Sequence, residues 1–423
     1  MKMRNNLLLL CLLLLPFSRG YSQLMLEACQ EKARGNYPLV KQYDLLEKSR
    51  EYTLANAGKG YLPQLSLSAK ATYQSEVTQL AVNLPGVEIK SLNKDQYQVV
   101  AELNQLVWDG GMIRAQKRAL QAESEIEYHR TDVELYAIRE RVNQLFFGAL
   151  LAEEQLKING LLQRELQQYD KQVSAYVQNG VASAADLDAV RVELLQVKQQ
   201  EEEVRAMRRA YRLMLAAMIG EEMDESLVLE KPVATGARET TAERRPEIQL
   251  FDQQERDLAL RQDLLTAKNR PRIALFAQGG YGNPGLNMLK NEFAGYYIAG
   301  ARLSWNFGNL YTLRNERKQL ALGQQLLQTR REAFLFHTRL EMTREQVEMD
   351  KWRRLLAQDD EVVQLRERIR VAAEAKVKEG TLGVLDLMRE VNRVDQARQA
   401  KILHEIQLLM AIYNIRYIVN SEK

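Results

Sequence analysis

The chain alternates between two hydrophobic periods, and each period predicts a different element. Apolar and polar residues take turns from Gln64 to Tyr73 and again from Tyr97 to Asn104. The same alternation returns from Ile273 to Tyr281 and from Tyr297 to Asn306. A period of two puts successive side chains on opposite faces of a strand, so we predict four strands, each with one apolar and one polar face. A tilted strand of about ten residues is long enough to cross a bilayer.

Long stretches with a helical period follow the second and the fourth strand, from Gly111 to Asn179 and from Asn309 to Glu379. No proline occurs between Gly86 and Lys231 or after Gly285, so the strongest helix breaker is missing from both stretches. At 1.5 Å per residue, each predicted helix is on the order of 100 Å long. A heptad pattern in the segment after the first helix predicts coiled-coil packing. Its members are Leu187, Val190, Leu194, Val197, Val204, Tyr211, Leu215 and Met218, with interruptions at Glu201 and Arg208.

Each long helix ends in a turn, and the two turns share a motif. Gly180 precedes Asp186 by six positions, and Gly380 precedes Asp386 by the same six, 200 positions further along the chain. A glycine just past a helix end suits a positive φ, and Ser183 with Asp186 resembles a capping box for the returning helix. Both motifs are therefore predicted to be the tips of helical hairpins. Helix-end chemistry alone could also explain both glycines and both aspartates.

Two pairs of prolines show that the whole unit is duplicated. Pro38 and Pro63 are 25 positions apart, as are Pro246 and Pro271. In each copy the first proline begins a helix and the second marks the change from helix to strand. We therefore predict a first structural repeat over residues 21–228 and a second over residues 229–423, each with a helix, two strands and a long helical hairpin. The segment from Glu221 to Thr241 contains Pro232 and Gly236 and is expected to connect the repeats.

The N-terminus has the features of a secretory signal peptide. Lys2 and Arg4 precede an apolar run from Leu7 to Phe17, which small residues follow. We expect residues 1–20 to be removed by cleavage after Gly20, with cleavage after Ser22 as the alternative. Three basic residues leave with this segment, so the 59 basic and 56 acidic residues of the full chain become 56 of each. A neutral chain disfavours nucleic acid as a partner.

Cysteine content and hydropathy further restrict the class of protein. Cys29 is the single thiol left after cleavage, so no internal disulfide is possible. No later apolar run reaches the ~18 residues of a membrane helix, so any membrane span must use strands.

Aromatic residues gather at the ends of the predicted strands, as in the girdles of an outer-membrane barrel, although a soluble sandwich would alternate equally well. They are Tyr61, Tyr73, Tyr97, Trp108, Tyr281, Phe293, Tyr296, Tyr297, Trp305 and Phe307.

Catalytic chemistry has no support in the sequence. His129, His337 and His404 stand alone on predicted helices, without the spacing of a metal site or a catalytic triad. The Gly279 to Gly282 segment follows a strand but does not lead into a helix, so it is not a phosphate loop. We expect no enzyme activity, no catalytic or metal-binding residues and no cofactor.

A signal peptide, duplicated strand pairs and long hairpins together resemble the TolC-like outer membrane efflux protein family. The most specific motifs are Trp108-Asp-Gly-Gly111, Arg245-Pro-Glu247 and the two glycine-to-aspartate tips, while Trp305-Asn-Phe-Gly-Asn309 lacks the usual double glycine. The resemblance covers essentially the whole mature chain. It implies a mainly α fold with a small transmembrane β portion, in which three protomers, each with four strands and two long antiparallel helical hairpins, form a 12-stranded barrel on an α-helical tube.

The resemblance also implies roles for individual residues. Asp186 and Asp386 align with acidic positions at the periplasmic aperture, and Leu382 stands where some relatives place a basic residue that locks the closed gate. Adaptor docking is expected at the hairpin tips, on Asn179, Gly180, Val181, Glu379, Gly380 and Thr381. The polar strand faces place Lys70, Glu102 and Arg302 toward the barrel lumen.

The implied function is the outer membrane channel, or exit duct, of a tripartite efflux or type I secretion system. Its expected partners are two further copies of itself in a homotrimer, a periplasmic adaptor (membrane fusion) protein, an inner-membrane pump of the RND, ABC or MFS type, and outer membrane lipid. The expected location is the outer membrane of a Gram-negative bacterium, extending into the periplasm. The alternatives are a periplasmic adaptor, which normally has one hairpin and several compact β-domains, and a coiled-coil scaffold without channel activity. The exported substrate is not readable from the sequence.

Overall fold

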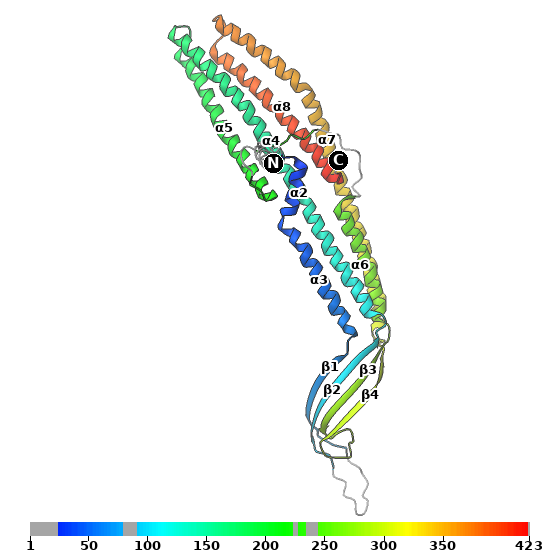
Figure 1. Ribbon diagram of the computed structural model, residues 1–423. Coiled ribbons are helices and arrows are strands. Elements are labelled where there is room, and N and C mark those ends of the chain that lie inside the picture. The colour runs from blue at the N-terminus through cyan, green and yellow to red at the C-terminus, as the bar shows by residue number, and fades with distance from the viewer. Residues whose placement is uncertain (1–23, 79–90, 223–226, 234–243, 422–423) are drawn as a thin grey trace, which may run out of the picture. The chain divides into compact units, whose positions relative to one another are not determined.

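The computed structural model describes residues 24–78, 91–222, 227–233 and 244–421 (Figure 1). The predicted signal peptide (residues 1–20) and parts of the predicted connector lie outside these ranges. The chain folds into two compact units, one with residues 1–40, 132–246 and 334–423, the other with residues 41–131 and 247–333. Each unit takes segments from both predicted repeats, so the boundary between residues 228 and 229 remains a sequence-level prediction. No helix among the described residues is long and apolar enough to cross a membrane.

The second unit contains one antiparallel sheet in the order β1-β2-β3-β4. Its strands are β1 (Gln64–Tyr73), β2 (Asp95–Trp108), β3 (Arg272–Asn283) and β4 (Ala294–Ser304). All four predicted strands are confirmed, although β2 extends to Trp108 and β4 begins earlier and ends two residues sooner than its alternation. Since the order is open, β1 and β4 form the two edges of this sheet.

Strand register confirms the predicted faces. Leu67 pairs with Ala101, and Ala277 pairs with Ala299, so the apolar series of neighbouring strands lie on one face. The side chains of this face stay open to solvent within the chain: Leu67 is 75% exposed and Leu303 is 68% exposed. Burying apolar surface is the main stabilising term in folding, so an exposed apolar area of this extent marks a contact surface.

The helices of this unit all meet one end of the sheet. Helix α3 (Lys41–Gly58) and the short η3 (Lys59–Tyr61) lead into β1, and α6 (Pro246–Lys268) leads into β3. Helices α4 (Met112–Gln178) and α7 (Asn309–Lys378) leave from β2 and β4. This arrangement follows from the order of elements in each repeat, because a strand pair returns the chain to the end at which it entered.

The bend between β2 and α4 explains the Trp108-to-Gly111 motif. Gly110 and Gly111 have φ values of +69° and +87°, which favour glycine. The carboxylate of Asp109 accepts hydrogen bonds from the backbone N–H groups of Gly111 (2.8 Å) and Ile113 (2.6 Å) and so caps α4. In the second repeat the side-chain oxygen of Asn306 accepts a hydrogen bond from the backbone N–H of Gly308 at 3.0 Å. The chain therefore bends here although this motif has one glycine fewer.

The first unit packs the far parts of α4 and α7 with α2 (Leu26–Asn36), η2 (Pro38–Val40) and the return helices α5 (Ala184–Ile219) and α8 (Val384–Val419). Half of the predicted heptad residues are buried, with Val190 and Leu215 fully inaccessible, and the other half are partly buried. Leu24 forms a parallel bridge with Leu229, which ties the start of the described chain to the connector. Cys29 is buried, and burial raises the pKa of its thiol to about 12, so it is an unreactive core residue.

Arg245, from the motif that begins the second repeat, is buried among aromatic rings in the same unit. Its guanidinium carbon lies 5.0 Å from the ring centre of Phe334 and 5.4 Å from that of Tyr417. Tyr417 in turn stacks on Tyr136 at 4.8 Å. Cation–π contacts of this kind strengthen when desolvated, so Arg245 fastens the start of the second repeat to α4 and α8.

Candidate functional site at the hairpin turns

The two turns have the same backbone geometry. Gly180 and Gly380 have φ values of +72° and +71°. After each glycine, the next N–H donates back to a helix carbonyl, from Val181 to Tyr176 at 2.8 Å and from Thr381 to Lys376 at 2.9 Å. This pattern ends an α-helix and reverses the chain, so both predicted hairpin tips are confirmed. No atom lies within 4 Å of a Cβ built on either glycine, so the positive φ alone explains the need for glycine.

All six residues predicted for adaptor docking are exposed at these turns. Two of them satisfy a carbonyl of their own helix: the Asn179 amide donates to Ala175 at 2.8 Å, and the Thr381 hydroxyl donates to Lys376 at 3.0 Å. Val181 is 66% exposed, which leaves an apolar side chain at the end of the first turn. The turns therefore offer a small surface with both polar and apolar groups. Its role in docking remains a prediction.

The two aspartates differ in what they contact. Asp186 forms the predicted capping box, because its carboxylate accepts from the Ser183 N–H (2.9 Å) and the Ser183 hydroxyl accepts from the Asp186 N–H (3.2 Å). Asp386 makes no such cap. Gly383 takes the place of the serine, and the Asp386 carboxylate pairs with Arg389 at 2.6 Å instead. Capping thus accounts for the first aspartate but not for the second.

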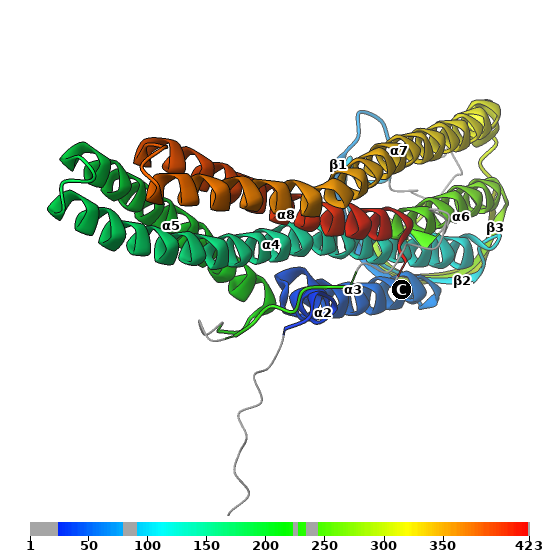
Figure 2. The same ribbon diagram turned by 90° about the horizontal axis from the view of Figure 1, so that it is seen from above.

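A shared hydrophobic core lies directly behind the turns, and Figures 1 and 2 show the two hairpins side by side there. It contains Leu166 and Val173 of α4, Val190 of α5, Val377 of α7 and Val391 of α8. Leu382 packs against this core. The position at which some relatives place a locking basic residue is therefore part of the packing here.

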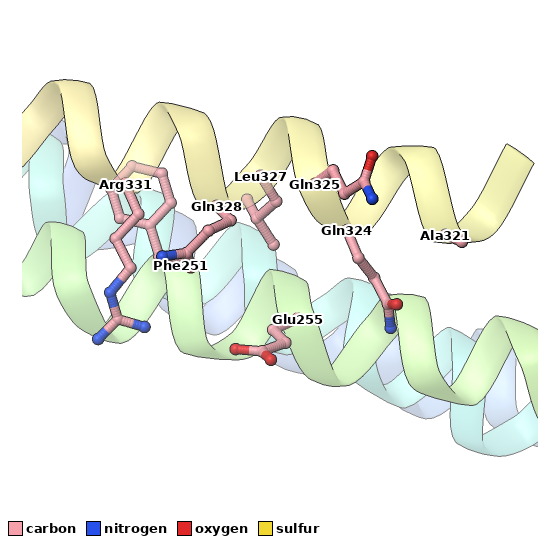
Figure 3. Close-up of a pocket in the computed structure, with 8 residues that line it drawn as sticks. All are labelled: Phe251, Glu255, Ala321, Gln324, Gln325, Leu327, Gln328 and Arg331. Atoms are coloured by element: carbon pink, nitrogen blue, oxygen red, sulfur yellow. The ribbon is translucent and has the colours of Figure 1, made fainter.

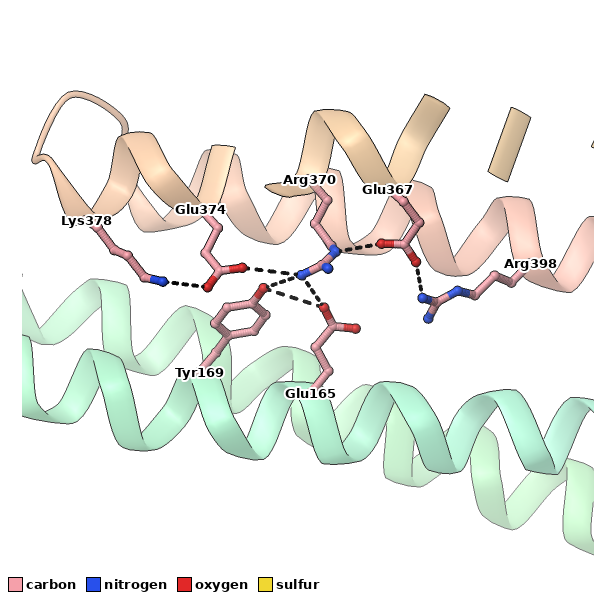
Figure 4. Close-up of polar contacts among 7 residues, drawn as sticks. All are labelled: Glu165, Tyr169, Glu367, Arg370, Glu374, Lys378 and Arg398. Atoms are coloured by element: carbon pink, nitrogen blue, oxygen red, sulfur yellow. Dashed lines mark hydrogen bonds and ion pairs between the residues drawn. The ribbon is translucent and has the colours of Figure 1, made fainter. Parts of the chain in front are cut away.

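A charged network crosses between the hairpins alongside this core, of which Tyr169 is a member (Figure 4). Arg370 of α7 donates to the Tyr169 hydroxyl of α4 at 2.8 Å and lies 2.7 Å from the Glu165 carboxylate. On its own helix it contacts Glu367 at 3.0 Å and Glu374 at 3.5 Å. The side chains of Arg370 and Glu165 are only 17% and 19% exposed, so water screens this ion pair less than a surface pair.

Two more cations extend the network. Arg398 of α8 pairs with Glu367, and Lys378 pairs with Glu374 at 3.0 Å (Figure 4). Burial would lower the pKa of Arg370, but its hydrogen bond to Glu367 and the charge of Glu165 outweigh burial and raise that pKa. Arg370 therefore stays charged. Burial raises the pKa of Tyr169 to about 12 against the opposing effect of Arg370, so the hydroxyl stays protonated. We call Glu165, Tyr169, Glu367, Arg370, Glu374 and Arg398 the hairpin lock.

Asp395 of α8 is the one group near this network with a pKa raised into the neutral range. Burial raises its pKa to about 6, although Arg398 and a hydrogen bond with Gln399 oppose the shift. One of its carboxylate oxygens has no hydrogen-bond partner in the described part of the chain. An ionised, incompletely paired carboxylate in a packed helix interface costs free energy, so ionised Asp395 destabilises the folded state.

The three predicted lumen residues lie on the polar face of the sheet. Register pairs Glu102 with Gln278 and Arg302 with Ala274, which places both on one face, and Lys70 with Gln98 on the same face. The Arg302 guanidinium lies 3.5 Å from the Glu102 carboxylate and 4.7 Å from the Phe276 ring centre. These contacts hold the charges in place on the sheet. Their position toward a lumen remains a prediction.

The same face contains two aromatic–glycine pairs that the sequence alone does not reveal. Tyr296 pairs in register with Gly280, and Phe276 pairs with Gly300. A Cβ on Gly280 would overlap the Tyr296 ring, and one on Gly300 would lie 3.2 Å from the Phe276 ring. Each ring therefore lies across its partner glycine. The glycines are visible in the sequence, but the pairing needs the register.

The other hollows and polar clusters offer no catalytic arrangement among the described residues. A groove of about 380 Å³ between α6 and α7 is lined by three glutamines together with Phe251, Glu255, Ala321, Leu327 and Arg331 (Figure 3). His404 contacts Asp359 at 2.8 Å and lies 5.3 Å from the Trp352 ring centre, as a packed helix residue does. Across the described ranges, no three His, Cys, Asp or Glu side chains are grouped as metal ligands.

Comparison with known proteins supports the family resemblance. Residues 30–221 match the family model of the outer membrane efflux proteins. Among curated proteins, none matches this chain. The match over the first repeat confirms the resemblance predicted from the sequence.

Solved structures extend the likeness in fold to both repeats. The outer-membrane channel OprN is 17% identical, with a TM-score of 0.71, and the alignment covers 93% of this chain and 89% of that one. VceC of Vibrio cholerae is 15% identical with a TM-score of 0.68 (93% and 96% covered), and the open state of the MtrE channel of Neisseria gonorrhoeae is 14% identical with a TM-score of 0.69 (93% and 88% covered). The chain therefore shares the fold of these channels over 93% of its length.

Proposed function

We propose that this chain is the outer membrane exit duct of a tripartite efflux or type I secretion system. The premise is that it matches the outer membrane efflux protein family and has the fold of its channels. The observation that carries the proposal is the four-stranded sheet, with an exposed apolar face, a polar face and two open edges. A lipid bilayer satisfies no backbone hydrogen bonds, so such a sheet can enter it only after both edges are paired.

Pairing of β1 of one chain with β4 of another satisfies both edges in a closed ring. Three protomers then give a barrel of twelve strands, and ring closure explains why the homotrimer is the functional unit. The apolar face with Leu67 and Leu303 meets outer membrane lipid. The polar face places Lys70, Glu102 and Arg302 toward the lumen, where water and cargo pass.

The hairpin turns form the periplasmic end of the duct. Asn179, Gly180 and Val181 of one turn and Glu379, Gly380 and Thr381 of the other receive a periplasmic adaptor, which links the duct to an inner-membrane pump of the RND, ABC or MFS type. Asp186 and Asp386 lie six residues beyond the two turn glycines. In a trimer they place six carboxylates around one aperture, which favours cations there.

The hairpin lock is proposed to hold this aperture closed. It joins α4 of the first hairpin to α7 and α8 of the second, so any movement that separates the hairpins must break the contacts of Arg370 with Glu165 and Tyr169. The duct is passive in this scheme. The energy for opening and transport comes from the pump, and the duct supplies a gate and a path, with no enzyme activity of its own.

Membrane fractionation tests the proposal first. A barrel protein stays with the outer membrane in salt and buffer and leaves it with detergent, whereas a coiled-coil scaffold or an adaptor without a barrel leaves with buffer. The purified protein should then run as a trimer and form channels in planar bilayers. Recovery of a buffer-soluble monomer without channel activity would refute the proposal.

Cysteine labelling tests the orientation. Asn287 lies in the β3–β4 loop, and loops opposite the periplasmic side of a barrel face the cell exterior. A thiol at Asn287 should react with an impermeant reagent on intact cells, and a thiol at Asn179 should not. The buried Cys29 provides a low background for this experiment. The reverse labelling pattern would invert the orientation. A second loop position, Asn83, belongs to the same expectation but lies outside the described residues.

A further inference from the structure

Basic residues are concentrated at the end of the sheet that joins the helices. The segments 59–63, 109–118, 268–272 and 305–318, which surround this end, contain ten basic and two acidic residues. Both acids are already engaged, because Asp109 caps α4 and Glu316 pairs with Lys268 at 3.5 Å. The described loop residues at the opposite end of the sheet, 74–78, 91–94 and 284–293, contain two residues of each sign. The excess of positive charge is therefore confined to one end.

The placement of these cations opposes the helix dipole. Arg114, Lys117 and Arg118 lie in the first two turns of α4, and no acidic residue lies in the first turn of α4 or of α7. A helix N-terminus is partially positive and favours acidic side chains, so basic residues there weaken the helix locally. Asp109 caps α4 and offsets part of this effect there, and the cations of α7 begin only in its second turn. The positive charge that remains at this end favours a negative partner outside the helices.

Arg314, Arg317 and Lys318 of α7 form the rim of a groove of about 410 Å³, whose apolar part is provided by Leu310, Leu313 and Ala321. All three cations line this groove, and none forms an ion pair with a described residue. The groove thus combines aliphatic side chains with three unneutralised positive charges. This combination complements an amphiphile with an acyl chain and an anionic headgroup.

Aromatic residues mark the level of the same surface. Trp108 ends β2 and is 43% exposed, Trp305 follows β4 and is 49% exposed, and Tyr311 in the first turn of α7 is 88% exposed. Tryptophan and tyrosine favour the headgroup level of a bilayer, and basic residues near that level attract anionic lipid. If the sheet crosses the outer membrane as proposed above, its helix-bearing end lies at the periplasmic leaflet.

We propose that these cations form a basic collar, made of Lys59 and the basic residues of segments 109–118, 268–272 and 305–318, which binds anionic phospholipid headgroups of the periplasmic leaflet. The groove on α7 holds one such lipid, with its phosphate at Arg314, Arg317 and Lys318 and its acyl chain along Leu310 and Leu313. This inference rests on the proposed insertion of the sheet. The collar fixes the depth of the sheet in the membrane and offsets the unfavourable charge at the helix N-termini.

Native mass spectrometry of the full-length protein in detergent tests the collar. The protein is titrated with phosphatidylglycerol and, separately, with phosphatidylcholine of the same acyl chains. Each cation near an anionic lipid surface contributes on the order of fivefold in affinity, so phosphatidylglycerol should bind at least about tenfold more tightly. Two triple variants, Arg314→Gln/Arg317→Gln/Lys318→Gln on α7 and Arg114→Gln/Lys117→Gln/Arg118→Gln on α4, should each reduce this preference.

The matched control is Arg330→Gln/Arg339→Gln/Arg368→Gln, which removes three exposed charges from α7 away from the sheet. It should keep the preference of the parent protein. Equal binding of the two lipids by the parent, or an unchanged preference in both collar variants, would overturn the proposal. Loss of the trimer mass in a collar variant would instead assign its cations to a contact between subunits, and so also overturn it. Channel activity of the parent is recorded separately, which distinguishes failure of the collar from failure of the duct.

Discussion

Removal of the Arg370 side chain should open the duct at its hairpin turns. Arg370→Gln deletes the contacts with Glu165 at 2.7 Å and Tyr169 at 2.8 Å that join α7 to α4. A hydrogen bond to a charged group contributes about 1.5–3 kcal/mol, and the partial exposure of this pair favours the lower part of that range. We therefore expect a loss of about 2 kcal/mol for each protomer, which is roughly a 30-fold shift from closed toward open.

Planar-bilayer recording measures this shift directly. Arg370→Gln should raise the mean conductance or the open fraction relative to the parent, provided that the trimer is intact. Arg368→Gln is the matched control, since Arg368 is an exposed arginine two residues away on the same helix with no ion pair among the described residues. It should behave like the parent.

A second variant removes the same ion pair from the other helix. Glu165→Gln leaves Arg370 with its partners on α7, Glu367 and Glu374, and should also raise the conductance or the open fraction. If Arg370→Gln conducts like Arg368→Gln, the lock does not hold the aperture. If Glu165→Gln conducts like the parent, the contact with Glu165 is not the reason for closure.

Three further predictions concern the core, the sheet and the turns. The folded-state pKa of Asp395 is raised from 3.8 to about 6, so its destabilising effect is absent below pH 3.8, grows between pH 3.8 and 6, and is constant above pH 6. Asp395→Asn should therefore stabilise the protein by roughly 2–3 kcal/mol at pH 7.5, seen as a higher melting temperature, and have little effect at pH 3.5. Leu67→Arg should reduce trimer yield in membranes, since a charge on the lipid face costs about 2–4 kcal/mol, while Ser68→Arg on the polar face should not; equal yields would contradict the assigned faces. Asp186→Asn should retain its cap, and Asp386→Asn should lose its pair with Arg389. The double variant should show weaker cation selectivity and weaker block by divalent ions than the parent. Unchanged selectivity would contradict the assignment of both aspartates to the aperture.

The elements that depend on local sequence were predictable. Hydrophobic period alone located the four strands and both long helices, because the change from period 3.6 to period 2 is read residue by residue. The positive φ of Gly180 and Gly380 and the capping box at Ser183 followed from helix-end chemistry. The faces of the strands were also correct, since antiparallel register preserves alternation.

Features that join distant segments were not predictable. Tyr169 and Arg370 are 201 positions apart, and neither stands out in its own helix. The aromatic–glycine pairs need the register of β3 and β4, and Asp395 is unusual only because of its burial. The roles of both aspartates looked equivalent by spacing, but the replacement of a serine by Gly383 gave them different contacts. Spacing in a sequence constrains local conformation, whereas these contacts depend on how helices from different repeats pack.

The missing cap at Gly383 has a consequence for symmetry. Duplication alone would give a trimer six nearly equivalent hairpin ends. A partner could then bind in any of six orientations, each related to the next by one sixth of a turn. Glycine is less favourable than serine at a helix start by only a few tenths of a kcal/mol, but the first turn of α5 has a side-chain cap that the first turn of α8 lacks. In the proposed trimer, capped and uncapped helix starts therefore alternate around the ring. A partner that distinguishes them can bind in three equivalent orientations rather than six, so the absent cap is one of the differences between the turns that set the rotational register of the proposed assembly.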